Sequence, residues 1–434
     1  MKNQISFKGM VTWSLCTLFF TYEFLLRTTL GTFQSQLMSD LHLTTVQFSL
    51  LSSTVFQLVY GLMQIPIGVI IDRVGLKMTL LTAAFLCTIA NLGFSFSHDF
   101  LCAIFFRVFM GLGASCGFIC LLISIYDWMP RKNTALFIGL SQFIGTLGPM
   151  LAAGPLSSLS DVSGIGWRQV FFQLSLVGAA LSVLVFFYVE NNRHQHNKFI
   201  FLTHSLSIFT QLLSLIKQKQ IWFIAVYSAC VYFSIEYLTE NEGIAFLVKK
   251  GCSSTFSSYM MTTAWIGYAL SCPFIGYFSD KIQRRKPFLV VTSLVTLLAL
   301  TFIIYLPITN ELLAISFALL GLGAGGSIIG YSIMAEQCTE SSLAAGLGLN
   351  NTMIVIASAL NAPLIGYLLS QVKTSHHVQL SNYQNAFMMM IVLAFSAAFI
   401  AIFCIKETFC KSACQNTILN PTKATFEVLG TPLT

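Results

Sequence analysis

The most regular feature of the chain is a series of long apolar runs separated by short polar segments. A helix needs about 20 mostly apolar residues to cross the hydrocarbon core of a bilayer. Twelve such runs are found, over residues 9–31, 45–67, 77–97, 101–126, 134–157, 169–189, 220–241, 256–278, 288–307, 311–334, 343–369 and 385–405. The pattern predicts an all-α membrane protein with twelve transmembrane helices. The first run contains Glu23 and Arg27 and has no small-residue cleavage site, so we assign it to helix 1 and not to a signal peptide.

The composition agrees with a membrane environment. Of the 434 residues, 56% are hydrophobic and 9% are charged, whereas about a quarter of the residues are charged in soluble domains. These values exclude a soluble enzyme and a disordered chain. The net charge of +7 lies on loops and lacks the clustered basic face that nucleic-acid binding requires. The 12 cysteines stand mostly alone in apolar runs, which predicts buried thiols and no metal site.

Lysine and arginine are unequally distributed between the two predicted sides of the membrane. With the N-terminus inside, 17 of the 23 basic residues lie on cytoplasmic segments and four lie outside, while Arg27 and Arg107 lie within the membrane. Because basic residues are retained on the cytoplasmic side, we expect both termini to be cytoplasmic. The chain shows no organelle-targeting pattern, and we expect it in the inner membrane of a bacterium.

A polar passage from Glu190 to about Lys219 divides the chain. We predict an N-terminal six-helix bundle over 1–190, a cytoplasmic linker over 191–219, a C-terminal six-helix bundle over 220–405 and a cytoplasmic tail over 406–434. Two motifs occur once in each half. The loop motif at 68–77 returns with a shift of 208, and Gly-Leu-Gly-Ala at 111–114 returns at 321–324 with a shift of 210. Such similar shifts indicate duplicated halves, as in some transporter folds.

These motifs resemble those of the major facilitator superfamily of secondary transporters. GVIIDRVGLK over 68–77 is similar to the family's signature loop between helices 2 and 3, and GYFSDKIQRRKP over 276–287 repeats it. RVFMGLGASCG over 107–117 is similar to the family's arginine-glycine motif in helix 4. The resemblance covers almost the whole chain. It implies two pseudo-symmetric six-helix bundles that rock about a site at the membrane midplane.

In this family the loop motif latches the two halves in the outward-facing state. The resemblance therefore implies a gating role for Gly68, Asp72 and Arg73 and, in the second half, for Gly276, Asp280 and Arg284. The alternative is that both loops only set the topology. Basic residues alone would set it, so the aligned glycine and aspartate favour the latch.

Charged residues inside the predicted helices are the candidates for a functional site. A charge near the bilayer centre costs about 2.5–3.5 kcal/mol and therefore needs a partner or a watery cavity. The candidates are Tyr22, Glu23 and Arg27 on helix 1, Arg107 on helix 4, and Glu236, Glu240, Asn241 and Glu242 near the end of helix 7, which Gly243 is expected to break. One alternative is a local pair of Glu23 with Arg27, one turn away. Helices 1, 4 and 7 line the cavity in the family, so the resemblance implies that these charges meet.

We predict separate roles for the acids and the bases. Glu23 and Glu236 are the candidate proton carriers, because a partly desolvated carboxyl group can exchange a proton near neutral pH. Arg27 and Arg107 are expected to bind a solute anion or to switch between partners. Neutral side chains that would complete the site are Gln57, Gln142, Trp265, Asn350 and Asn351. Each has an alternative role as an interhelical hydrogen-bonding group.

The sequence thus predicts proton-coupled uptake of a small polar or anionic organic solute, a carboxylate or an amino acid. The alternative is proton-driven efflux of a drug or metabolite. It is suggested by glycines and prolines in helix 5, including Gly145, Gly148 and Pro149, that resemble an exporter motif but also suit helix packing. A polytopic sensor or membrane enzyme is a remote alternative. We expect no enzyme activity and no cofactor. The expected partners are a small solute, protons and the lipid bilayer, with no nucleic acid and with the chain acting as a monomer.

Overall fold

The computed structural model describes residues 6–129, 134–191, 215–307, 309–338, 343–371 and 379–410. Among these residues the chain is helical and has no β-strand. Within this described part of the chain, eleven spans are long and apolar enough to cross a membrane. The expected span at 256–278 is the 29-residue helix α14 (Ser254–Ile282), which is roughly 43 Å long at about 1.5 Å per residue. The all-α fold expected from the apolar runs is therefore confirmed.

Several expected spans consist of two consecutive helices. The first half of the chain contains α1 (Phe7–Thr32), α2 (Gln34–Asp40), α3 (Thr45–Ser49), the π-helical turn η1 (Leu50–Thr54), α4 (Val55–Val74), α5 (Leu76–Ser95), α6 (Phe100–Ala114), α7 (Cys116–Trp128), α8 (Thr134–Ala152), α9 (Gly154–Ser163) and α10 (Trp167–Tyr188). The second half contains α12 (Lys219–Glu240), α13 (Gly243–Lys249), α14, α15 (Lys286–Tyr305), α16 (Asn310–Ala324), α17 (Gly326–Gln337), α18 (Leu343–Ser370), α19 (Leu380–Phe399) and the π-helical turn η3 (Ile400–Cys404).

Polar caps define where several helices begin. The side chains of Ser6, Thr44, Asp99, Ser253 and Thr309 accept backbone N–H groups from the first turns of α1, α3, α6, α14 and α16. Such caps satisfy donors that have no partner within the helix. Each cap stands directly before an apolar run, which is why the helices begin within a few residues of the positions expected from hydropathy.

The two halves repeat the same local features at equivalent positions. The chain turns through positive φ at Gly75, between α4 and α5, and at Gln283, between α14 and α15. These positions differ by 208 residues, the shift of the loop motif. The helix-4 span is interrupted at Ser115 and the helix-10 span at Gly325, which differ by 210 residues, the shift of the Gly-Leu-Gly-Ala motif. The structure thus supports the internal repeat inferred from the sequence.

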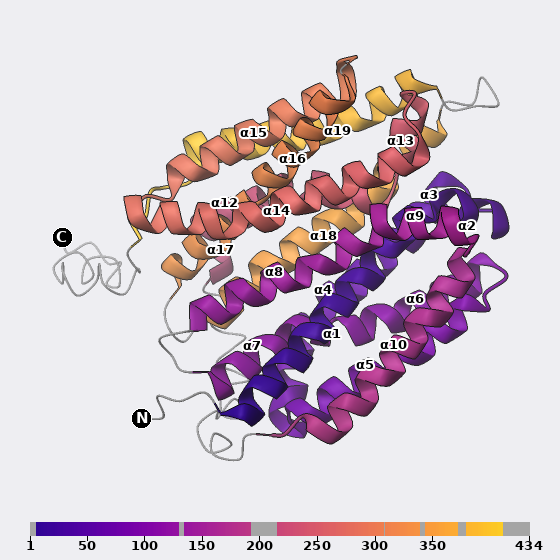
Figure 1. The fold of residues 1–434 in the computed structure, drawn as a ribbon. Coiled ribbons are helices and arrows are strands. Elements are labelled where there is room, and N and C mark those ends of the chain that lie inside the picture. The colour runs from indigo at the N-terminus through magenta and orange to yellow at the C-terminus, as the bar shows by residue number, and fades with distance from the viewer. Residues whose placement is uncertain are drawn as a thin grey trace, which may run out of the picture.

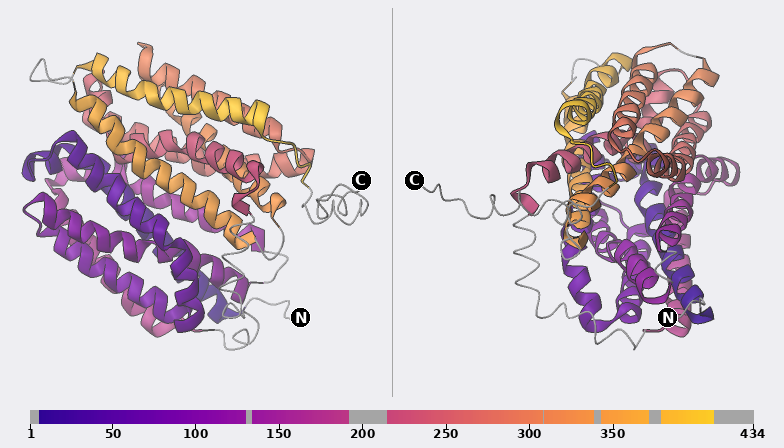
Figure 2. Two further views of the ribbon diagram at one scale, coloured as in Figure 1. Left: turned by 180° about the vertical axis from the view of Figure 1, so that it is seen from behind. Right: turned by 90° about the vertical axis from the view of Figure 1, so that its left-hand side faces the viewer.

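The helices of the first half, coloured indigo to magenta, lie beside those of the second half, coloured red to yellow (Figure 1, Figure 2). Each half has its own apolar core, which includes Phe19 and Phe94 in the first half and Ile303 and Phe387 in the second. The beginning of α1 and the end of α19 lie at one end of the bundle (Figure 1). The short helices α2, α3, α9 and α13 gather at the opposite end, where α1 finishes. We call this the Thr32 end.

Candidate functional site

Arg27 of α1 lies between two glutamates of α12. Its guanidinium forms an ion pair with Glu236, and its Nε lies 2.5 Å from Oε1 of Glu240. Because Glu236 and Glu240 are four residues apart on one helix, both can face α1. Gln57 of α4 donates to the other carboxylate oxygen of Glu240 at 2.9 Å. The three charged side chains are at most 8% exposed. A buried ionic network therefore joins the two halves of the chain.

Glu23 does not supply the main partner of Arg27, although the two are one turn apart. The Glu23 side chain is fully buried, and its Oε1 lies 3.5 Å from the hydroxyl of Tyr60 on α4. Its Oε2 has no hydrogen-bond partner among the described residues. A buried carboxylate with so few donors is costly in its charged form. Glu23 is thus a buried acid with one carboxylate oxygen left unbonded.

Arg107 has surroundings that differ from those expected for an anion-binding residue. Its guanidinium donates to four backbone carbonyls, those of Leu26 (3.0 Å) and Arg27 (3.2 Å) in α1 and of Leu51 (3.1 Å) and Ser52 (2.9 Å) in η1. A further N–H points to Sδ of Met110 at 3.6 Å, and the guanidinium lies 4.4 Å from the ring centre of Phe56. An arginine has five N–H donors. All five are occupied, so none is free for a solute anion in this conformation.

The other predicted side chains fall into two groups. Gln57 and Asn351 reach across the boundary between the halves. Gln57 donates to Glu240, and Asn351 Nδ2 lies 3.5 Å from Oε1 of Gln64. Tyr22 stays within the first half, where its hydroxyl donates to the Leu174 carbonyl at 2.8 Å. Trp265 stays within the second half and packs edge-on against Tyr232 and Tyr268. Asn350 is buried, whereas Gln142 is partly buried.

The central charges are not exposed to a watery cavity. Glu23, Arg107 and Glu236 are 0% exposed, and Arg27 is 7% exposed. From the sequence alone, either a partner or water was needed to hold these charges in the membrane. The structure supplies partners: carboxylates for Arg27 and backbone carbonyls for Arg107. In this conformation the two glutamates of the second half therefore neutralise Arg27 of the first half.

Asn241 marks the end of α12 and joins the halves at the Thr32 end. It has φ −129° and ψ −112°, and α13 begins two residues later at Gly243, so the expected break in helix 7 is confirmed. Its side-chain oxygen accepts a hydrogen bond from Ser52, and its Nδ2 donates to Ser53 at 2.7 Å. Both serines belong to η1. The π-helical turn of one half thus binds the helix end of the other.

Further contacts close the Thr32 end. A Cβ on Gly31 would lie 2.3 Å from the Thr239 carbonyl, so only glycine allows α1 to approach α12 this closely. Other hydrogen bonds across the boundary join Thr54 to the Ala359 carbonyl (2.8 Å), the Gly154 N–H to Thr262 (2.8 Å) and Thr255 to Asp161 (2.9 Å). The pairs α1–α12, η1–α18 and α9–α14 are therefore in contact there.

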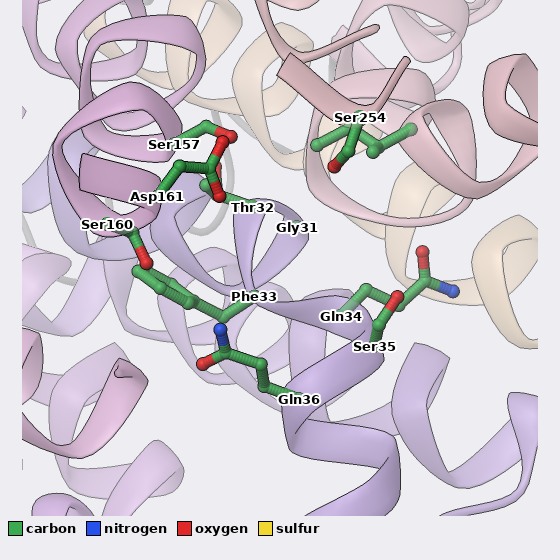
Figure 3. A pocket seen from close by; sticks show the side chains of 11 residues that line it. Gly31, Thr32, Phe33, Gln34, Ser35, Gln36, Ser157, Ser160, Asp161 and Ser254 are labelled. Carbon is green, nitrogen blue, oxygen red and sulfur yellow. The ribbon is translucent and has the colours of Figure 1, made fainter. Parts of the chain in front are cut away.

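A polar pocket of about 110 Å³ lies at the same end, next to the α1–α2 junction (Figure 3). Its lining includes Gln34, Gln36, Ser157, Asp161 and Ser254, which come from both halves. No arginine or lysine is found among the described residues that line the pocket. The buried cluster around Arg27, and not this pocket, is therefore the better candidate for binding an anion.

The loop motif of the second half forms a separate ionic cluster. Asp280 lies 2.6 Å from Arg285, and Arg285 lies 2.8 Å from Glu336 of α17. The expected base, Arg284, instead lies 5.5 Å from the Phe409 ring. The base that pairs with Asp280 is thus Arg285, which the shift of 208 aligns with Lys77, and the gating role expected for Arg284 stays a prediction. Burial opposes the charge of Arg285, but the hydrogen bond to Glu336 and the nearby Asp280 outweigh it and raise the pKa of Arg285.

Gly276 has open space around its α-carbon. The first-half motif lies in α4 and at its end. The side chains of Asp72 and Arg73, like the surroundings of Gly68, lie outside the described part of the chain, as do residues 192–214 of the expected linker and residues 411–434 of the expected tail.

Three residues around the buried cluster were not predicted from the sequence. Tyr60 faces Glu23, and Ser52 and Ser53 hold Asn241. The adjacent serines in an otherwise apolar run were a usable signal, because buried hydroxyl groups need partners. No sequence pattern indicated the π-helical turn that orients them.

Two helical halves that repeat each other and meet around a buried ionic cluster define a membrane protein built from two homologous bundles. The family model of the Major Facilitator Superfamily matches residues 15–249 and 241–416, and the chain belongs to this family. A solved bacterial homolog of the human lysosomal transporter Spinster, in an inward-facing and unoccupied conformation, has TM-score 0.76 and 17% identity, with 92% of this chain and 97% of that chain covered. At this identity the likeness shows the fold.

Two curated relatives are similar over part of the chain. The probable L-galactonate transporter of Escherichia coli (strain K12) is 26% identical over 189 residues, which cover 43% of this chain and 41% of the relative. The hexuronate transporter of Bacillus subtilis (strain 168) is 24% identical over 251 residues, which cover 57% of this chain and 58% of the relative. The chain thus spans about half the length of these relatives.

Proposed function

We propose that the protein is a secondary active transporter that takes up a small organic acid together with protons by alternating access. The observation that carries the proposal is the position of Arg27, which belongs to the first half but is held by Glu236 and Glu240 of the second. Halves that rock apart must break this network. The free energy of the ion pairs is therefore coupled to the opening of the Thr32 end.

The charges at the centre favour proton coupling. Three buried glutamates, Glu23, Glu236 and Glu240, accompany two buried arginines, Arg27 and Arg107; a fourth buried glutamate, Glu242, bonds to Tyr383 and is not counted in this set. One negative charge is in excess, and a single proton would neutralise the set. Burying an unpaired charge is unfavourable, so closure is expected to require that proton. Glu23 is the proposed carrier because one of its oxygens has no partner within the described structure, whereas Glu236, the other candidate, is held in an ion pair with Arg27.

Arg27 is the proposed binding group for the solute. When the halves separate, its guanidinium loses both glutamates and can form charge-assisted hydrogen bonds with a solute carboxylate. The names of the two curated relatives refer to L-galactonate and hexuronate, both of which are carboxylates. This agreement supports an organic acid over an amino acid or a neutral solute. Gln57 and Asn351 lie at the same boundary and are proposed to bind polar groups of the solute.

The distribution of lysine and arginine supports an orientation with the Thr32 end outside and both termini in the cytoplasm. We place the protein in a bacterial inner membrane, acting as a monomer. The first-half loop with Gly68, Asp72 and Arg73 is the proposed latch for the cytoplasmic end, where it would act when the Thr32 end opens. Labelling Lys250→Cys and Lys281→Cys with an impermeant thiol reagent on intact cells tests the orientation. Only the first should react.

No observation favours export over uptake. The helix-5 glycines that suggested export serve packing, since a Cβ on Gly145 would meet the Phe20 ring at 2.4 Å and one on Gly148 would meet the Thr21 carbonyl at 2.4 Å. Both contacts are with α1, which carries Glu23 and Arg27. The glycines therefore allow α8 to lie against the helix that bears the site.

Transport by purified protein in proteoliposomes tests the proposal. The solute panel contains galactonate, glucuronate, an amino acid and galactitol as a neutral control of similar size. Acid outside should drive accumulation of a sugar acid and not of galactitol, and a protonophore should abolish it. One charge crossing 100 mV provides about 2.3 kcal/mol, which corresponds to roughly fifty-fold accumulation. Accumulation driven only by acid inside would favour export, and absence of flux for every solute would refute the proposal.

A further inference from the structure

Helix 2 contains an irregularity at the point where it meets Arg107. Over Leu50–Thr54 the helix forms a π-helical turn, and the N–H of Val55 bonds to the carbonyl of Leu50. In a regular α-helix this N–H would bond to Leu51. The carbonyl of Leu51 is thereby released, and Nε of Arg107 donates to it at 3.1 Å. The π-helical turn therefore depends on an external donor, which Arg107 provides.

The same turn carries the residues that close the Thr32 end. Ser52 and Ser53 lie within it and bind Asn241 of the other half. Arg107 also donates to the Ser52 carbonyl at 2.9 Å. One side chain thus holds the backbone of the residue whose hydroxyl makes the contact between the halves.

Arg107 connects this turn to the ionic network. It donates to the carbonyl of Arg27 at 3.2 Å and to that of Leu26 at 3.0 Å. The backbone that carries the Arg27 side chain and the backbone that carries Ser52 are therefore fixed to one guanidinium. Both features that cross to the second half at this level, the Arg27 ion pairs and the serine contacts, are positioned together.

The second half provides an internal comparison. Gly111 packs on the Phe56 carbonyl and Gly321 on the Ala264 carbonyl, so α6 and α16 cross their neighbours in the same register. The shift of 210 then places Phe317 at the position of Arg107. Phe317 is fully buried, and its neighbour α14 continues without a π-helical turn. In the second half no π-helical turn of α14 releases a carbonyl beside this position, and the position equivalent to Arg107 holds a hydrocarbon side chain.

We infer that Arg107 is a positioning residue that holds α1 and the π-helical turn of helix 2 in the arrangement that closes the Thr32 end, and that it does not bind solute. This inference rests on the proposed alternating access. The distance measurement that tests it, however, uses neither solute nor proton gradient, so its failure would leave the transport proposal standing, and failure of transport would not decide it.

The test measures a distance across the Thr32 end. Val162 of α9 and Val248 of α13 are 89% and 43% exposed and belong to different halves. Each is replaced by cysteine and spin-labelled in the full-length chain, with the partly buried native cysteines replaced by serine, and the distance distribution is recorded in liposomes. Arg107→Met should raise the ratio of long to short distances by at least about fivefold, the lower range for coupled sites. Arg107→Lys, which keeps one donor group, should give a smaller rise.

Arg168→Met is the matched control. Arg168 also donates to a backbone carbonyl, that of Ser97 at 2.6 Å, and lies over the Trp167 ring at 4.1 Å, but all three residues belong to the first half. Its distance distribution should remain that of the wild type. If Arg107→Met cannot be purified, Arg107→Lys decides alone. Wild-type distances in the Arg107 variants would overturn the inference. So would a KM increase in Arg107→Lys that is confined to anionic solutes while the distances stay unchanged.

Discussion

Two arginines of this protein each lie between two acids, but in different settings. Arg27 is bound by Glu236 and Glu240, and these three side chains are at most 8% exposed. Arg285 is bound by Asp280 and Glu336, and Asp280 is 66% exposed. The first cluster joins the two halves, whereas the second lies within one half. A similar set of charges can therefore form a contact that must break when the halves separate, or a contact that stays within one half.

The difference has an energetic consequence. Removing one partner of a buried ion pair costs about 3–5 kcal/mol because the remaining charge is left buried. In the Arg27 cluster this penalty is avoided only while the halves are together or while solute and proton replace the lost partners. In the Arg285 cluster water reaches Asp280, and the partners do not separate as the halves move. The first cluster should control transport, and the second should mainly control stability.

The largest effect is expected for Arg27→Gln. It leaves Glu236 and Glu240 without a cation and removes the proposed solute-binding group. Solute exchange in proteoliposomes should fall by at least about 100-fold, equivalent to about 2.7 kcal/mol of transition-state stabilisation. In the matched variant Arg285→Gln the rate of solute exchange should fall by no more than about tenfold. Equal losses in the two variants would remove the distinction between the clusters.

Glu23→Gln should separate accumulation from exchange. The amide cannot release a proton, so acid-driven accumulation should vanish while solute exchange stays within about threefold of the wild type. Wild-type uptake should rise as the outside pH falls, and that of the variant should not. Glu242→Gln is the control, since Glu242 is also buried but bonds to Tyr383 within the second half. Retention of the pH response in Glu23→Gln would exclude Glu23 as the carrier.

Glu336→Gln should affect stability and not coupling. The change weakens the ion pair with Arg285 and should lower the free energy of unfolding by about 1–3 kcal/mol. Thermal unfolding in detergent measures this, with Glu311→Gln at the exposed beginning of α16 as the control. An altered pH dependence of uptake in Glu336→Gln would show that the second cluster also takes part in coupling.

The smallest effect is expected for the surface ion pair of Lys8 with Glu190. The two groups are 2.8 Å apart, but their side chains are 65% and 49% exposed. Lys8→Ala should change the free energy of unfolding by less than about 1 kcal/mol, because water and salt screen such pairs. A larger loss in the same thermal assay would mean that exposure does not rank the ion pairs of this protein.

Hydropathy was sufficient to predict the helical spans, because a bilayer requires long apolar helices with internally bonded backbones. It could not predict the π-helical turn at Leu50–Thr54, because no change in residue type along the chain marks this turn. Composition does not distinguish the adjacent basic residues 284–286, so the sequence did not identify Arg285 as the partner of Asp280.

The candidate site was only partly predictable. Glu23, Arg27 and Glu236 were identified because charges are rare in apolar runs, and the structure pairs Arg27 with Glu236. Composition cannot tell, however, whether a buried arginine binds a carboxylate or a carbonyl. That choice depends on which backbone groups are released nearby, as at Leu51 beside Arg107.

The most direct test of the central claim is the distance between spin labels at Val162 and Val248 in Arg27→Gln, without solute and at neutral pH. If the Arg27 ion pairs hold the Thr32 end closed, this variant should shift to long distances while Arg285→Gln keeps the wild-type distribution. A wild-type distribution in Arg27→Gln would contradict the claim that the network between Arg27, Glu236 and Glu240 controls the opening of the protein.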